Sequence, residues 1–222
     1  ITNETKEDIY ELGEEEHVLR DKFFFGLSRN FDWGKRLRWW LQKRNALQKE
    51  DSLLVTSNNA MRPPVAPLEL FTEYESTRNQ DIIQEYFIPT RNFANFMKDL
   101  KKIVQEEQVN LLSSTIRYVK PNNESIMSYA PDEDMFAIVF FTNIKSTTKG
   151  KENAEKVTRK IVDLAFENEG TYYLTYQLFP TEEQMRKGYV RTEEFFNKKR
   201  EYDPKETFMN KFYAKYALGE DP

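Results

Sequence analysis

Apolar and polar positions follow two different periods along the second half of the chain. Runs in which apolar and polar residues alternate are typical of half-buried strands, and stretches in which apolar residues recur every three or four positions are typical of helices. The predicted strands cover residues 82–89, 110–119, 135–142 and 171–177, and the predicted helices cover residues 91–107 and 151–168. Because the run 135–142 is apolar on both faces, we expect it to be a central strand.

The order strand, helix, strand, strand, helix, strand predicts an α+β fold. It is typical of the ferredoxin-like βαββαβ unit, an antiparallel sheet with both helices on one face. Gly170 follows the second helix as a stop signal. The tail is predicted to be helical again, since Thr181 to Gln184 has the pattern of a capping box and Thr192 opens a further helix. We expect residues 80–222 to form this core domain with its C-terminal helices.

The first part of the chain is less regular. We expect a helix within Thr5–Phe25 and an amphipathic helix over Ser28–Asn45, followed by a long extended loop at the proline-rich stretch Ser57–Pro67. Residues 1–79 are therefore predicted to be a helical and extended segment that packs on the core. The tryptophan and arginine content of the second helix also suits a membrane surface or a partner, so peripheral membrane association stays open.

Composition narrows the classes of function. The 222 residues are 39% hydrophobic and carry 33 Lys and Arg against 37 Asp and Glu, a net charge of −4. These charges are interspersed, which argues against a nucleic-acid partner, because such proteins present a basic face. The absence of cysteine favours a reducing, cytoplasmic location. His17 is the only histidine, and its glutamate neighbours indicate a solvated acidic face, so we predict no metal site.

Candidate chemistry centres on the predicted strand within Asn110–Pro121. Alternation places Thr115 and Arg117 on one face, where Arg117 is either a solvated arginine or one aimed into a pocket. Since both helices must cover one side of the sheet, the other side is free to bind a ligand. Further candidates for that side are Glu85, Ile138 and one set of the tyrosines Tyr172, Tyr173 and Tyr176. A Glu85–Arg117 pair would be either functional or a structural ion pair.

Several common motifs are missing from the sequence. It contains no GxGxxG, GxxxxGK[ST], GxSxG or HExxH motif, so a self-contained nucleotide-binding or hydrolase site is not expected. The aromatic strand motifs of RNA-recognition domains are missing as well.

Five segments resemble one known family, in its order and at its spacing. They are QEYFIPTRNFANFMKDL, VNLLSSTIRYVKP, MFAIVFFT, GTYYLTYQLFPTEEQM and REYDPKETFMNKFYAKY, within residues 80 to 217. They are similar to the C-terminal half of FAD-linked oxidases of the vanillyl-alcohol oxidase superfamily, near the alditol oxidase, aldonolactone oxidase and decaprenylphosphoryl ribose oxidase branches. Residues 1–79 fit the family only loosely.

This resemblance implies the substrate-binding or cap domain of an FAD-dependent oxidoreductase. In the family, an N-terminal domain holds FAD, and the C-terminal sheet lies over the flavin ring and forms the substrate pocket. Hydride transfer from an alcohol, sugar or aldonolactone to the flavin is then the implied reaction. The chain begins with Ile1 rather than Met, so we expect a longer parent chain that supplies the FAD-binding domain. We expect this fragment to be inactive by itself.

The resemblance also implies roles for particular residues. The polar residues that the family carries on its sheet match Glu85, Thr115 and Arg117, which are the catalytic candidates, and Arg117 would orient the substrate oxygen. Alditol oxidases have Glu-x-Arg where this chain has Thr115 to Arg117, and ribose oxidases have a lysine where it has Tyr176. The residues expected to face substrate or flavin are Tyr176, Tyr172, Ile138 and Phe136.

Two further expectations concern the free side of the sheet. Without its flavin domain, this side should expose apolar groups, which a homodimer or a folded-over N-terminal segment would cover. The alternative function is a stand-alone module that binds a small ligand or a partner on this side, without redox activity.

Overall fold

The structure is a computed structural model that describes residues 17–48 and 78–220. The chain divides into two compact units, Ile1–Ser76 and Thr77–Pro222. The predicted loop 57–67, and most of the helix predicted within 5–25, lie outside the described residues.

The described part of the first unit is a pair of helices, α1 (Val18–Asn30) and α2 (Asp32–Gln48). The predicted boundary near residues 25–28 was wrong, because the helix break falls at Phe31, which is extended and donates its backbone N–H to the Leu27 carbonyl. Gly34 makes the tight connection possible, since a Cβ there would lie 2.4 Å from the Leu27 oxygen. The break is thus set by packing between the helices, which helical periodicity does not reveal.

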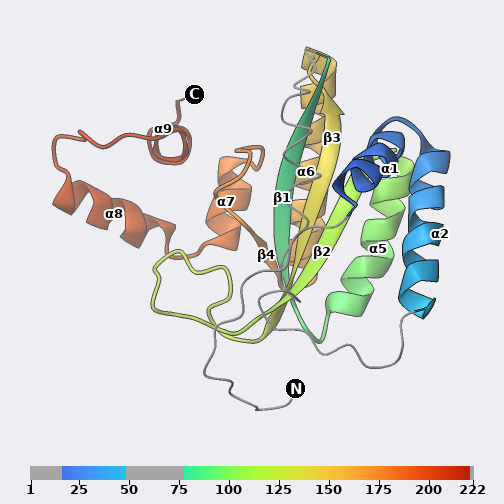
Figure 1. The fold of residues 1–222 in the computed structure, drawn as a ribbon. Helices are drawn as coiled ribbons and strands as arrows, with labels where there is room; N and C mark the ends of the chain where they lie inside the picture. The colour runs from blue at the N-terminus through green and yellow to red at the C-terminus, as the bar shows by residue number, and fades with distance from the viewer. Residues whose placement is uncertain (1–16, 49–77, 221–222) are drawn as a thin grey trace, which may run out of the picture. The chain divides into compact units, whose positions relative to one another are not determined.

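The second unit contains a four-stranded antiparallel sheet in the order β2-β3-β1-β4 (Figure 1). Its strands are β1 (Asn79–Pro89), β2 (Leu111–Val119), β3 (Met135–Lys145) and β4 (Thr171–Tyr172). The helices α5 (Phe93–Glu106) and α6 (Thr148–Glu167) connect β1 to β2 and β3 to β4. This order and connection give the predicted α+β, ferredoxin-like fold.

Both crossover helices pack on the same face of the sheet. The main core joins strand residues such as Ile88, Ile138 and Phe140 to Phe96 of α5 and Ile161 of α6. Because directly paired residues of antiparallel strands share a face, the even-numbered residues of β1 and β3 lie under the helices. We call the other side of the sheet the open face.

The end of α6 shows why a glycine follows it. Glu169 adopts the left-handed conformation (φ 60°), while the N–H groups of Glu169 and Gly170 donate to the carbonyls of Phe166 and Ala165. These are the two hydrogen bonds of a Schellman motif, so the left-handed residue is Glu169 and not the predicted glycine. Gly170 is needed for a different reason, since a Cβ there would lie 2.3 Å from the Phe87 carbonyl oxygen of β1.

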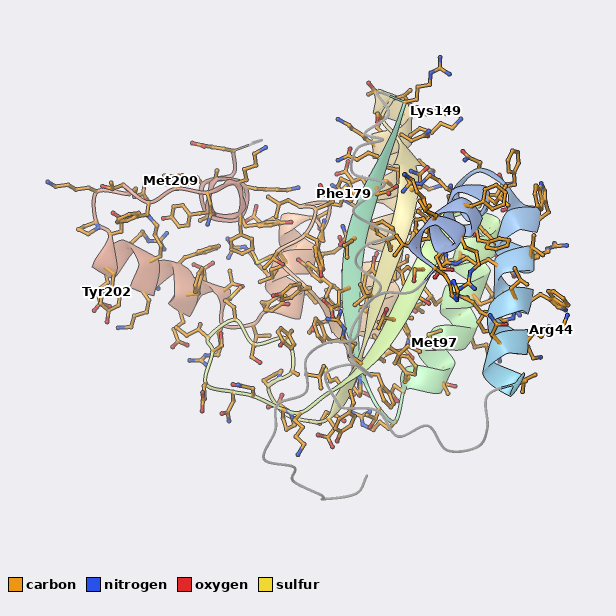
Figure 2. All side chains as sticks on the ribbon, in the orientation of Figure 1. Arg44, Met97, Lys149, Phe179, Tyr202 and Met209 are labelled. Carbon is orange, nitrogen blue, oxygen red and sulfur yellow. The ribbon has the colours of Figure 1, made fainter. Side chains whose placement is uncertain are left out.

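The tail forms three short helices, α7 (Glu182–Gly188), α8 (Thr192–Tyr202) and α9 (Lys211–Leu218) (Figures 1 and 2). The capping box is confirmed, because Thr181 and Gln184 exchange both of its hydrogen bonds. A satellite core of Met185, Phe196, Tyr213 and Tyr216 holds these helices together. Among the helices of residues 17–48 and 78–220, none is long and apolar enough to cross a membrane.

Candidate functional site

The open face carries the three polar residues that the sequence singled out. Glu85 of β1 and Thr115 of β2 both pair with Val139 of the central strand β3, so all three point to the same side. Arg117 pairs with Ala137 one row further along. The prediction that Glu85 and Arg117 lie opposite the helices is confirmed. Small side chains of β3 thus separate a carboxylate from a guanidinium.

Glu85 is the unusual residue of this group, since its side chain is only 6% exposed. Burial raises its pKa, and the positive charge of Arg117 and a hydrogen bond from Tyr176 oppose that rise. The Tyr176 hydroxyl donates to Glu85 Oε2 at 3.4 Å. Burial and the neighbouring Glu85 charge raise the pKa of Tyr176 in turn, so its phenol remains a proton donor at neutral pH.

Aromatic rings form a wall beside Glu85. Phe87 stacks on Tyr129 with ring centroids 4.1 Å apart, and Tyr173 contacts the rings of Phe87, Tyr129 and Tyr176 edge to face. Tyr129 comes from the connection between β2 and β3, whose backbone also accepts a hydrogen bond from Thr171 Oγ1. The wall therefore combines β1, this connection and the segment after β4.

Tyr129 was not among the predicted site residues, and Tyr173 was named only as one possible member of the tyrosine set. Tyr129 lies in a polar loop without periodicity, so nothing in the sequence signals its position. Alternation separates Tyr173 from Tyr172, but only the pairing of Thr171 with Phe87 places Tyr173 on the open face.

Three of the predicted substrate-facing residues lie on the wrong side of the sheet. Ile138 is 1% exposed in the core beneath the helices, and Tyr172 belongs to the same core and contacts Phe166 of α6. Phe136 packs against Phe93 of α5. The bulkier set of β3 side chains thus faces the helices, and the smaller set, including Ala137 and Val139, faces the open side.

The predicted strand 171–177 is also shorter than expected. Only Thr171 and Tyr172 pair with β1, after which the chain turns away. As a result Tyr173 and Tyr176, three positions apart, both reach the open face, which strict alternation would forbid. Of the four residues expected to face substrate or flavin, only Tyr176 lies there.

A separate cavity of about 760 Å³ lies beyond Tyr176, between the segment 174–179 and helices α8 and α9. Its lining includes the apolar side chains of Leu174, Leu178, Phe195 and Phe212 together with Lys211 and Lys215. Tyr176 borders both this cavity and the polar group around Glu85.

The open face combines a proton acceptor with several hydrogen-bond donors. Glu85 provides a proton acceptor whose pKa is raised, Tyr176 a donor, and Arg117 and Thr115 provide exposed donors two strands away. In the part of the chain that the structure describes, no three His, Cys, Asp or Glu side chains gather as a metal site would require.

No family model matches the chain, and no curated protein matches it. Among solved structures, it is similar to a C-terminal segment of the alpha subunit of aIF2 from Pyrococcus abyssi, at 13% sequence identity and a TM-score of 0.26. That match covers 72% of this chain and 93% of the other. A similarity of this size carries no argument about function, and the fold described above rests on strand order and register.

Proposed function

We propose that this chain is the substrate-binding part of an FAD-dependent oxidoreductase that oxidises an alcohol, a sugar or an aldonolactone. The observation that carries the proposal is the pairing of buried Glu85 with Tyr176 on the face of the sheet opposite α5 and α6, with Arg117 in electrostatic range. The three residues that the resemblance selects for catalysis are thus among the polar residues of this face. By itself the chain is expected to be inactive.

Flavin would supply one thing, the acceptor for the hydride of the substrate C–H bond. The aromatic wall and the hydrogen-bonding groups beside it suit the substrate side of such a planar ring. Among the described glycines, Gly34, Gly150 and Gly170 are each closed against the chain's own backbone and offer the phosphates of FAD no cradle. We therefore assign the main FAD site to a domain outside this chain.

The proposed roles follow from charge and position. Glu85 in its ionised form accepts the proton of the substrate hydroxyl as the carbonyl forms. Tyr176 holds the carboxylate in place through its hydrogen bond. Arg117 binds the substrate oxygen and orients the C–H bond, and Thr115 contributes a further hydrogen bond from the same strand.

The test uses NMR titration of the chain with sorbitol and with an aldonolactone. The expected result is that signals of Glu85, Thr115, Arg117 and Tyr176 shift on binding, and that Arg117→Gln weakens binding about tenfold or more. The matched control is Arg191→Gln, which removes an exposed arginine from the connection between α7 and α8 and should bind like the unmodified chain.

A second measurement concerns the flavin. The purified chain should be colourless and should retain no FAD near unit stoichiometry after gel filtration. A flavin absorbance band at that level, or probe binding that Arg117→Gln leaves unchanged, would contradict the assignment.

A second candidate function rests on the cavity beside Tyr176. Its volume and its apolar lining suit a small ligand held without redox chemistry. If the probes shift signals of Leu174, Phe195 and Phe212 and leave Arg117 unaffected, this ligand-binding module is the better description.

The proposed location is the cytoplasm, because the chain has no cysteine. Peripheral contact with a membrane is proposed as well.

A further inference from the structure

Helix α2 carries a stripe in which tryptophans alternate with cations. Its members recur at the three-, four- and seven-residue spacings that share one helix face. We call this set the tryptophan stripe: Trp33, Arg36, Trp40, Lys43, Arg44 and Leu47.

The tryptophan stripe lies on the side of α2 that turns away from α1. Gly34 faces α1 through Leu27, and Arg38 faces it through the Phe25 ring, 4.8 Å from the guanidinium. Helical periodicity puts the stripe on the remaining side. Trp33, Trp40 and Leu47 are 55%, 52% and 76% exposed, and the three cations of the stripe are exposed as well.

Aromatic ring and cation are combined within the stripe itself. The guanidinium of Arg44, labelled in Figure 2, lies 5.4 Å from the ring centroid of Trp40. Trp39 borders the stripe at 68% exposure, and α1 adds exposed Leu19 and Phe23. The helix pair thus presents large apolar side chains and positive charge together.

The charge of the helix pair is opposite to that of the chain. Val18–Gln48 contains eight Lys and Arg residues and two Asp, a net charge of +6, while the whole chain has a net charge of −4. Both aspartates are engaged elsewhere, Asp21 by Arg20 and Asp32 by Lys35. The two acidic side chains within Val18–Gln48 thus form ion pairs with cations outside the stripe.

We propose that the α1–α2 helix pair binds the surface of an anionic lipid membrane through the tryptophan stripe. Indole rings are favoured at the level of the lipid headgroups, where the ring leaves water and the N–H keeps a hydrogen bond. Arg36, Lys43 and Arg44 then meet lipid phosphates, each attracted by the negative surface potential. This inference concerns residues 18–48 and is independent of the redox proposal.

Charge complementarity favours lipid over a protein partner. A protein that covered the stripe would bury three cations among the tryptophans and would need an acidic partner for each, since unpaired buried charges are costly. A second copy of the chain would bring the same positive stripe and add repulsion. The lipid headgroup layer contains many phosphates at the same depth as the indole rings. The cations can therefore pair with phosphates without requiring one fixed arrangement of partners.

The experiment exploits the position of the tryptophans. All three tryptophans of the chain lie in α2, so intrinsic tryptophan emission reports on this helix alone. The full 222-residue chain is mixed with vesicles of phosphatidylcholine containing phosphatidylglycerol, or with vesicles of pure phosphatidylcholine. The expected result is a blue shift of the emission and co-sedimentation with the anionic vesicles only, both reduced by high salt.

Two variants separate the contributions of ring and charge. Arg36→Glu with Lys43→Glu should weaken binding to anionic vesicles at least about tenfold, since each cation near the surface contributes substantially. Trp33→Ala with Trp40→Ala should cause a similar loss of co-sedimentation. Both pairs are exposed, so the helix content measured by circular dichroism should stay unchanged.

The matched controls make equal changes in the second unit. Lys120→Glu with Lys149→Glu reverses the same number of exposed charges, and Tyr202→Ala with Phe208→Ala removes two rings that are 81% and 80% exposed. Both controls should bind vesicles like the unmodified chain.

Three outcomes would overturn the proposal. One is an emission that anionic vesicles leave unchanged, and another is a loss of binding as large in the controls as in the stripe variants. The third is lipid-independent dimerisation, seen by light scattering and abolished by Trp33→Ala with Trp40→Ala, which would assign the stripe to a second copy.

Discussion

Glu85 is the residue whose environment departs most from what its type prefers. It is buried on the sheet face opposite α5 and α6, and Arg117 and Tyr176 partly compensate for its burial. Since the charge of Arg117 lowers the pKa of Glu85, Arg117→Gln should raise that pKa further, and Tyr176→Phe should raise it less. Carbon-detected NMR titration of the carboxyl group measures both changes. An unchanged pKa in Arg117→Gln would show that the two charges do not interact.

The same residue makes stability depend on pH. Because the pKa of Glu85 is higher in the folded than in the unfolded state, the protonated carboxyl stabilises the fold more than the ionised one does. This contribution to the free energy of unfolding is complete below the unfolded pKa and is lost as pH rises through the folded pKa. In Glu85→Gln, the free energy of unfolding should lack that decline, which begins at about pH 4.3, the ordinary pKa of an unfolded glutamate. Urea titrations across this range give the comparison, and a decline of equal size in the variant would contradict the assignment.

Position 170 requires glycine because there is no room for a Cβ atom, and not because of its backbone conformation. An added Cβ would meet the Phe87 carbonyl at 2.3 Å and Ile88 Cδ1 at 2.6 Å, so α6 or β1 must shift. Gly170→Ala is expected to cost about 2 kcal/mol or more in unfolding free energy. Gly219→Ala is the control, because its Cβ meets nothing within 4 Å and only its φ of 71° is unfavourable, at about 1 kcal/mol. Equal costs would mean that the close approach to β1 is unimportant.

At the scale of elements, α7 is held by its first turn. Thr181 and Gln184 close the capping box, and the Gln184 amide also donates to Arg159 O and Asp163 Oδ1 of α6. Thr181→Ala should cost about 1 kcal/mol and Gln184→Ala about 2 kcal/mol, because the second change also removes the link between helices. Glu183→Ala, in the same turn and exposed, should be close to neutral in chemical denaturation. A Gln184→Ala cost no greater than that of Thr181→Ala would argue against the link.

At the scale of the whole molecule, the second unit has a closed core of its own. The sheet, α5 and α6 share one cluster of buried side chains, and the C-terminal helices add a satellite. We therefore expect residues 77–222 to fold alone, with a cooperative urea transition and dispersed amide signals that match those of the full chain. A molten or unfolded product would mean that residues 1–76 complete the core.

The sequence by itself determined the order of strands and helices, the antiparallel ferredoxin-like sheet, and the shared face of Glu85, Thr115 and Arg117. These follow from local periods, which short-range geometry imposes on each element. It also identified the Thr181 capping box, because that motif is complete within four residues.

The tertiary structure alone decided which face of β3 meets the helices. Both faces of MFAIVFFT are apolar, so alternation divides the residues into two sets without telling which set is buried. Only the register with β1 shows that Val139, and not Ile138, lies beside Glu85. The short length of β4 and the position of Tyr129, which comes from the loop between β2 and β3, likewise depend on contacts between segments that are far apart in the sequence. Such contacts leave no period in the sequence, because the residues that make them are not neighbours along the chain.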